Sequence, residues 1–138
     1  GYRLPTEAEA DYLLRAKGTT PSNGFPFRNG VDDLKYHAWY RDNSGFQTHP
    51  VAELEPLVLD GTKDFYDLHG NVEEWVYDWY ANLVGGENPQ GPNEGSSRVA
   101  RGGGMSDHGY ALRSGLRHYY EPHGLKMDLG FRLVRTLK

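Results

Sequence analysis

The chain has 138 residues, of which 37% are hydrophobic and 25% are charged, and its formal net charge is −4. This length suits one domain with its own core. The apolar content argues against wholesale disorder, and no apolar run approaches the roughly 18 residues that span a bilayer, so membrane insertion is not expected. The basic residues of the last third are spaced singly, which argues against a nucleic-acid partner. The absence of cysteine excludes disulfides and thiolate metal sites.

The clearest helix signal lies near the start of the chain. Thr6 stands before an apolar pattern of helical spacing, and Glu9 follows three residues later, which is the arrangement of a capping box. Gly18 is a natural stop because glycine readily ends helices. The sequence therefore predicts a helix over residues 7–17.

The stretch from residue 18 to residue 64 consists mainly of turn signals. The whole chain holds 18 glycines and 8 prolines, and many of them punctuate this stretch. Short aromatic runs separate the turns. This pattern predicts a loop-rich segment with short strands.

The segment over residues 64–80 fits both a helical and a strand period. Its aromatic content and the Gly70-Asn71 turn inside it favour a short strand after a tight turn. Three further strand-like runs lie at residues 98–101, 112–120 and 129–134. Together these runs predict a small antiparallel sheet, few helices and much irregular loop, which is an α+β fold.

Three stretches of sequence carry a family resemblance. They read GYRLPTEAE at residues 1–9, GNVEEW at 70–75, and RGGG at 101–104 followed by LGFRLV at 129–134. Each alone is weak, but their order and spacing together resemble the formylglycine-generating enzyme family, also called sulfatase-modifying-factor domains.

The resemblance implies a C-type-lectin-like fold. It also implies that residues 1–138 form the C-terminal portion of a single domain whose N-terminal portion is absent from this chain. A complementary N-terminal segment or chain is then an expected partner, and residues 1–138 alone are expected to be poorly soluble or molten. The resemblance further favours a bacterial source and an extracytoplasmic or cell-surface location.

Departures from the family pattern bear on activity. Catalytic members use two cysteines shortly after the Arg-Gly-Gly motif to bind copper, whereas residues 105–111 contain none. Serine is a poor ligand for Cu(I), so no copper and no formylglycine-generating activity are expected. Glu73 stands where the family usually has tryptophan, and Gly104 stands where serine is usual. These departures suggest a divergent branch.

The resemblance implies a calcium site at the Gly-Asn-x-x-Glu-Trp turn. Its ligands would be the Asn71 side chain, the Val72 carbonyl and the Glu74 carboxylate, all of them oxygens as calcium prefers. The alternative is that Asn71 merely occupies the turn while Glu74 caps a helix or pairs with an arginine. Glu73 would either add a ligand or point to solvent.

The resemblance also places a ligand-facing surface on the last two strands and their connecting loops. Polar and aromatic residues of the types that bind partners with little ordering cost lie there. The candidate ligand-binding residues are Met105, Ser106, Asp107, His108, Tyr110, Arg117, Tyr119, Tyr120 and His123. The alternative for one of the two adjacent tyrosines is burial in the core. The six histidines lack the spacing of a metal site, so we expect scattered surface or hydrogen-bonding roles for them.

These observations predict a non-catalytic binding or structural module with a protein or small-ligand partner. Two alternatives stay open. In the first, the chain forms part of the pocket of an oxygen- or iron-dependent oxidoreductase, whose catalytic residues come from an upstream region. In the second, it is a hypervariable lectin-like ligand-binding protein of a diversity-generating retroelement.

Overall fold

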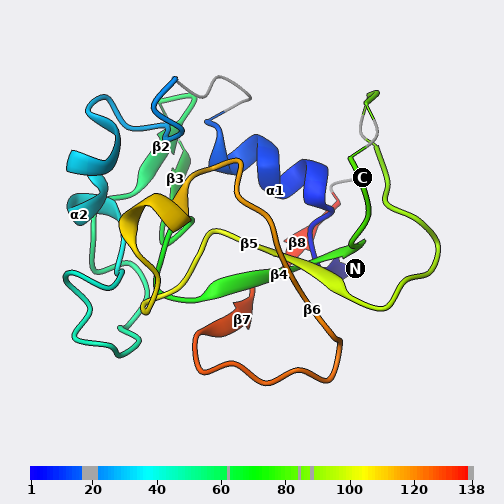
Figure 1. Cartoon of the computed structure of the whole chain (residues 1–138). Helices are drawn as coiled ribbons and strands as arrows, with labels where there is room; N and C mark the ends of the chain where they lie inside the picture. The colour runs from blue at the N-terminus through cyan, green and yellow to red at the C-terminus, as the bar shows by residue number, and fades with distance from the viewer. Residues whose placement is uncertain (17–21, 62, 84, 88, 137–138) are drawn as a thin grey trace.

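The computed structural model describes residues 1–16, 22–61, 63–83, 85–87 and 89–136, and it confirms an α+β architecture with two short α-helices and small sheets (Figure 1). The elements are β1 (Tyr2–Arg3), α1 (Glu7–Leu14), the 3-10 helix η1 (Gly30–Asp32), α2 (Leu34–His37), β2 (Leu57–Leu59), β3 (Lys63–Phe65), β4 (Glu73–Trp79), β5 (Arg98–Arg101), the 3-10 helix η2 (Gly109–Leu112), β6 (His118–Tyr120), β7 (Leu129–Phe131) and β8 (Val134–Arg135). Among the described residues, no helix has the length and apolar character needed to cross a membrane.

The central sheet has the strand order β6-β5-β4-β7. Strands β4, β5 and β6 pair in antiparallel fashion, as expected, but β7 lies parallel to β4. The expectation of a purely antiparallel sheet is therefore wrong for this one pairing. Because β6 and β7 lie at opposite edges and run in the same direction, the loop between them must cross the sheet. Figure 1 shows this long connection below β4 and β5.

Helix α1 begins as predicted and ends earlier than predicted. The hydroxyl of Thr6 accepts a hydrogen bond from the Glu9 backbone, and the Glu9 carboxylate accepts one from the Thr6 backbone, which confirms the capping box. The helix ends at Leu14, with Arg15 as its C-cap. The predicted end at residue 17 and the stop at Gly18 lie outside the described residues.

The hydrophobic core cluster lies largely where turns dominate the sequence. The loop-rich segment contributes most of its side chains, and η2 closes it with Leu112. The buried members are Phe25, Phe27, Leu34, Ala38, Tyr40 and Leu112. Rather than short strands alone, the segment forms η1, α2 and the β2–β3 hairpin. Aromatic burial therefore compensates for its scarce regular backbone.

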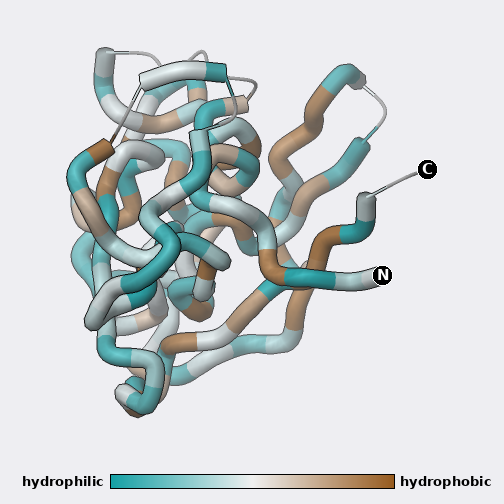
Figure 2. The backbone as a smooth tube through the Cα atoms, turned by 90° about the vertical axis from the view of Figure 1, so that its right-hand side faces the viewer, coloured by the Kyte–Doolittle hydropathy of each residue, from teal (hydrophilic) through white to brown (hydrophobic). Residues whose placement is uncertain are grey.

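The strand predictions hold in part. Strands β4 and β5 are confirmed at residues 73–79 and 98–101. The predicted run at 112–120 is a strand only at its end, because η2 and a turn occupy its first part. The run at 129–134 divides into β7 and β8, and β8 pairs with β1. This last pairing brings β1 and β8 side by side, and Figure 2 shows the start of the chain beside the last described segment.

Candidate functional site

The turn before β4 positions the candidate site. Gly70 has a φ of +78°, and a Cβ there would collide with the carbonyl oxygen of Trp39. Asn71 follows with a φ of 62°, a conformation that asparagine tolerates better than most residues. This sharp turn starts β4 two residues later and directs the Glu73 side chain into the protein, where it is only 1% exposed.

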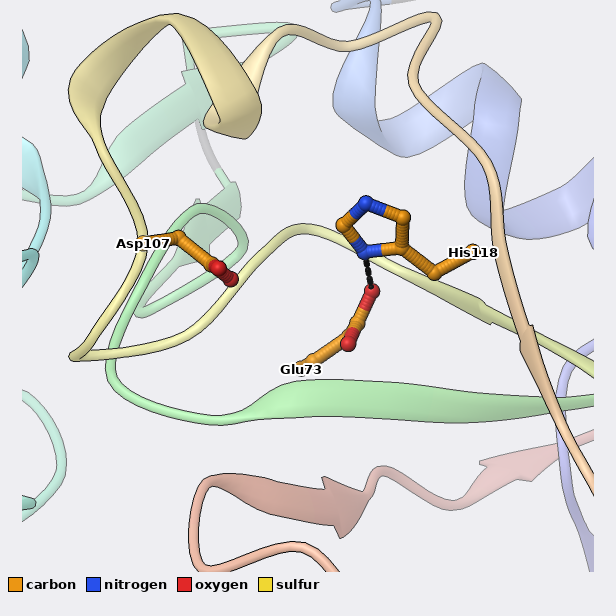
Figure 3. Close-up of side chains that lie close together, drawn as sticks. All are labelled: Glu73, Asp107 and His118. Atoms are coloured by element: carbon orange, nitrogen blue, oxygen red, sulfur yellow. Dashed lines mark hydrogen bonds and ion pairs between the residues drawn. The ribbon is translucent and has the colours of Figure 1, made fainter.

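Glu73 is the centre of a polar network. Its Oε1 is hydrogen bonded to Nδ1 of His118, and its Oε2 accepts a bond of 2.7 Å from the Tyr120 hydroxyl. The ammonium of Lys126 lies 3.1 Å from the same Oε2. Figure 3 shows Glu73 and His118 facing each other between β4 and β6. Burial of a carboxylate requires such partners, and this one has three.

Lys126 extends the network to two further carboxylates. Its ammonium lies 3.1 Å from Asp128 and 3.9 Å from Asp107. Asp128 also accepts a bond of 2.6 Å from the Ser106 hydroxyl. A Cβ at Gly104 would collide with the Asp128 carboxylate, so the absence of the family's usual serine makes room for this aspartate. We call Glu73, Ser106, Asp107, His118, Tyr120, Lys126 and Asp128 the Glu73 network.

Mutual hydrogen bonds and charges shift the titration of this network. Burial alone would raise the pKa of Glu73, but the hydrogen bonds from His118 and Tyr120 outweigh it and hold that pKa below its usual value. The bond to Glu73 raises the pKa of His118. Burial and the Glu73 carboxylate raise the pKa of Tyr120 to about 12. The network therefore favours a charged Glu73 beside a protonated His118 and a neutral Tyr120.

Three members of the network lie close enough to hold a metal ion. One ligand atom each from Glu73, Asp107 and His118 lies within 4.8 Å of the others (Figure 3). Two carboxylates and one imidazole suit a transition metal better than calcium, which prefers oxygen ligands alone. Lys126 already places a cation beside two of these groups, so an incoming ion would compete with its ammonium.

Two of the three predicted calcium ligands, the side chains of Asn71 and Glu74, have protein partners. The Asn71 side chain accepts a bond from the His49 backbone N–H and donates one to its carbonyl. Both carboxylate oxygens of Glu74 accept bonds from Arg132, at 2.8 and 3.0 Å. This arrangement matches the alternative in which Asn71 occupies the turn and Glu74 pairs with an arginine. Calcium binding by Asn71, Val72 and Glu74 stays a prediction.

Glu73 itself departs from one expectation. The sequence left open that its side chain adds a ligand or points to solvent, and solvent exposure is wrong because the carboxylate is buried. The signal for Glu73 in the sequence was a glutamate at a motif position where the family usually has tryptophan. The sequence did not reveal His118 and Lys126 as partners of Glu73, because they lie 45 and 53 positions away along the chain.

The structure does not gather all candidate ligand-binding residues at one place. Ser106, Asp107 and Tyr120 belong to the Glu73 network. Met105 is buried in the core. His108 and His123 are exposed, and His108 contacts Arg41 at 2.7 Å. The tip residue Tyr110 is 66% exposed.

Arg117 and Tyr119 lie apart from that network. Tyr119 stacks on Tyr80 with 4.1 Å between ring centroids, and the Arg117 guanidinium lies 4.7 Å from the same Tyr80 ring. Arg117 also forms a two-pronged ion pair with the buried Glu7. Neither of the two adjacent tyrosines is fully buried in the core. Tyr120 is half-buried, and Tyr119 is 54% exposed.

A groove of about 740 Å³ lies beside Arg117, between α1 and the segment after β4. Its floor contains Glu7 with Arg101 and Arg117, and these charges are paired with one another. Its apolar walls include Tyr12 and Leu83. No pattern in the sequence pointed to this groove, because its lining comes from four separate segments.

Comparisons with known proteins agree with the fold. The family model of the sulfatase-modifying factor enzyme 1-like domain matches residues 1–137. The solved structure of Treponema denticola variable protein 1 shares 38% identity and a TM-score of 0.83, covering 96% of this chain and 47% of that one. PvdO from Pseudomonas aeruginosa shares 28% identity and a TM-score of 0.74, with 96% and 51% covered. A formylglycine-generating enzyme from Mus musculus is 34% identical over 96% of this chain and 38% of its own length.

The chain spans between 21% and 50% of the length of the curated relatives it matches. The match nevertheless covers almost every residue of the chain, and the solved relatives share its fold. The family resemblance carried by residues 1–9, 70–75, 101–104 and 129–134 is thus confirmed. The chain belongs to the sulfatase-modifying factor enzyme 1-like domain family.

Proposed function

We propose that this chain is a non-catalytic binding module that presents a ligand- or protein-binding surface near its C-terminal strands. The observation that carries the proposal is that the buried Glu73 contacts side chains from two segments of the C-terminal part of the chain. His118 and Tyr120 come from β6, and Lys126 comes from the loop before β7. One carboxylate thus fixes β6 and this loop relative to each other.

Such a fixed base supports binding because it lowers the ordering cost when a partner arrives. Tyr110 in η2, Tyr119 in β6 and His123 in the loop after β6 are exposed. Tyrosine offers a large amphipathic contact area with few rotatable bonds. An exposed surface of this kind suits a peptide, a glycan or a protein. An extracytoplasmic or cell-surface location remains part of the proposal.

Copper-dependent chemistry is not part of this function. The formylglycine-generating relatives resemble this chain in fold and motifs, but the chain contains no cysteine. A copper site built on thiolates therefore has no ligands in these 138 residues. The alternative of an iron-dependent oxidoreductase depends on residues supplied from outside them.

Cation binding is a second component of the proposal. The grouping of Glu73, Asp107 and His118 supports a divalent ion that competes with Lys126. The oxygens of Asn71, Val72 and Glu74 support calcium by their chemistry. Each cation site requires an existing ion pair to break. Lys126 must leave Glu73 in the first site, and Arg132 must leave Glu74 in the second.

One comparison favours the alternative of a hypervariable ligand-binding protein. The solved structure that resembles this chain with a TM-score of 0.83 is called a variable protein. Sequencing the gene from many isolates tests this alternative. It predicts variation at exposed Tyr110, Tyr119 and His123 and constancy at Glu73. Uniform sequences, or variation spread evenly over the chain, would rule it out.

The binding proposal is tested on glycan and peptide arrays with the full-length protein. We expect at least one array ligand to bind, and we expect the exposed-surface variants Tyr110→Ala, Tyr119→Ala and His123→Ala to weaken that binding at least fivefold. Tyr36→Ala is the matched control, because Tyr36 is 49% exposed on α2. Equal binding by all four variants, or chemical conversion of the bound compound, would contradict the proposal.

A further inference from the structure

One arginine in the loop after α2 is bound to no carboxylate. Arg41 is exposed, and within the part of the chain that the structure describes it forms no ion pair. Arg101 and Arg132, by contrast, are each bound to carboxylates. Arg41 instead donates a hydrogen bond of 2.7 Å from Nη1 to Nε2 of His108. Its other side-chain N–H groups have no acceptor among the described residues, so they are free to bind a ligand.

The ring of Phe46 lies against this guanidinium. The central carbon of the guanidinium is 5.7 Å from the centroid of the ring, which is a cation–π contact. The ring is 59% exposed, and the Phe46 backbone has a φ of 58°. A bulky residue rarely adopts this left-handed conformation, and strained residues of this kind cluster at ligand-binding sites. The exposed ring therefore offers an apolar contact beside the cation.

Backbone contacts hold these two side chains against the segment that carries the histidine. The Arg41 N–H donates a bond of 3.0 Å to the Asp107 carbonyl. The Ser44 hydroxyl donates one of 2.7 Å to the Met105 carbonyl and accepts one of 3.0 Å from the Phe46 N–H. The site thus comes from two segments that are bonded to each other. Such preorganisation lowers the ordering cost when a ligand binds.

His108 fixes the direction of the guanidinium. Because a guanidinium can only donate hydrogen bonds, Nε2 of His108 must accept the bond from Arg41, and the proton of the ring then lies on Nδ1. His108 is one of the predicted ligand-binding residues, whereas nothing in the sequence singled out Arg41 or Phe46. The structure therefore joins one predicted residue to two that come from a different part of the chain.

The charges around Arg41 indicate which kind of anion fits. A guanidinium and a carboxylate are both planar and can form two parallel hydrogen bonds. A phosphate monoester carries about two negative charges near neutral pH and suits a cluster of cations better. Here a single arginine is available, its chain neighbour Asp42 is exposed, and the whole chain has a net charge of −4. These charges favour a carboxylate.

We propose that Arg41, Phe46 and His108 form a site for a carboxylate that is joined to an apolar group. Arg41 binds the carboxylate, and the apolar group packs on the exposed ring of Phe46. His108 is a positioning residue that holds the guanidinium beside the ring. An aromatic acid and a peptide whose last residue is apolar both carry this chemistry. The site shares no residue with the surface variants of the proposed function, so each proposal can fail without the other.

Ligand-observed fluorine NMR with the full-length protein tests the proposal. The probe is 4-fluorophenylacetate, and 4-fluorophenylacetamide, which has nearly the same shape and no charge, is the matched control ligand. We expect the acid to bind at least fivefold more tightly than the amide and to lose this advantage in Arg41→Gln. Arg28→Gln is the control variant, because Arg28 is also exposed and forms no ion pair with a described residue. Equal binding of acid and amide, or equal losses in the two variants, would overturn the proposal.

Further variants separate the roles of the ring and the histidine. Phe46→Ser should weaken the binding of acid and amide by a similar factor, because the ring contacts the apolar group that both share. His108→Ala should weaken only the acid, and His108→Gln should restore at least half of that loss, because its side-chain oxygen can accept the bond from Arg41. Unchanged binding in Phe46→Ser, or no rescue by His108→Gln, would contradict the assigned roles.

Competition against the same probe identifies the class of ligand. Phenyl phosphate is expected to displace the probe less well than phenylacetate does, and stronger displacement by the phosphate would overturn the choice of a carboxylate. Displacement by the tripeptide Ala-Ala-Phe with a free C-terminus, but not by its C-terminal amide, would identify a peptide as the source of the carboxylate. Displacement by phenylacetate and by neither form of the tripeptide would identify a small acid.

Discussion

The ammonium of Lys126 lies 3.1 Å from a carboxylate oxygen of Glu73, and Glu73 is one of the least exposed side chains of the protein. The chain neighbours of Lys126, Leu125 and Met127, project fully or almost fully into solvent. Lys126 therefore points inward between two outward neighbours and anchors its loop to β4. The network makes Lys126 a cation held within the protein at a place where a metal ion could bind.

Replacing Lys126 tests this anchoring role. Lys126→Met keeps the side-chain length but leaves Glu73 and Asp128 without their shared cation. Hydrogen bonds to charged groups contribute about 1.5–3 kcal/mol, so we expect the melting temperature to fall by roughly 5–10 °C. We also expect added Zn²⁺ to restore part of this loss. Lys35→Met on exposed α2 is the control, and an equal effect of both variants in calorimetry would contradict the anchoring role.

The bond between His118 and Glu73 predicts a pH dependence of stability. Because Glu73 raises the pKa of His118 in the folded protein, the stabilisation is complete below the usual histidine value of 6.5 and is lost as pH rises through the raised pKa. Urea unfolding at several pH values should show His118→Gln less stable than the parent at pH 6, with the gap narrowing toward pH 9. His123→Gln serves as the exposed control. If the stability difference between His118→Gln and the parent grew with rising pH, the predicted direction of the pH dependence would be wrong.

His69 predicts the opposite response. Burial lowers the pKa of His69 to about 4, while the ring keeps a bond of 2.8 Å to the carbonyl of Leu112. Below pH 6.5 the His69 ring therefore binds a proton in the unfolded state but not in the folded state. The free energy of unfolding falls as pH drops from 6.5 to 4. The depressed pKa corresponds to about 3 kcal/mol across this window. In urea unfolding, His69→Gln should lose less stability between pH 6.5 and pH 4 than the parent does. If the two proteins lose the same stability, other groups cause the acid sensitivity.

Calcium titration separates the two candidate cation sites. We expect calorimetry to detect calcium binding to the parent, and a chelator to lower its melting temperature. Glu74→Gln should weaken binding at least tenfold if the turn holds the ion, whereas Asp107→Asn should leave it unchanged. A loss confined to Asp107→Asn would move the ion to the Glu73 network. Calcium bound only in trace amounts, together with an unchanged melting curve after chelation, would contradict calcium binding.

Local signals in the sequence predicted the elements that depend on local interactions. The capping box of Thr6 and Glu9 needs only four consecutive residues, and the turn at Gly70 and Asn71 needs only two. The family motifs then supplied the fold class. These features could be predicted because each is decided by neighbours in the chain.

The pairing of distant charges could not be predicted in the same way. Lys126 reaches Glu73 across 53 positions, and Arg132 reaches Glu74 across 58. Which charges meet depends on the parallel placement of β7, which follows from the loop that crosses the sheet. The candidate ligand-binding residues were separated for the same reason, because the fold places Arg117 beside Glu7 on α1 and Tyr120 beside Glu73 on β4.

The central claim is that the C-terminal strands and their loops form the binding surface. The most direct measurement is hydrogen exchange by mass spectrometry, with the full-length protein free and bound to the ligand found on the arrays. We predict slower exchange in residues 105–112 and 118–124 and no turnover of the ligand. Protection confined to α1 and to residues 81–83 and 89–92, which contribute to the groove, would contradict the claim.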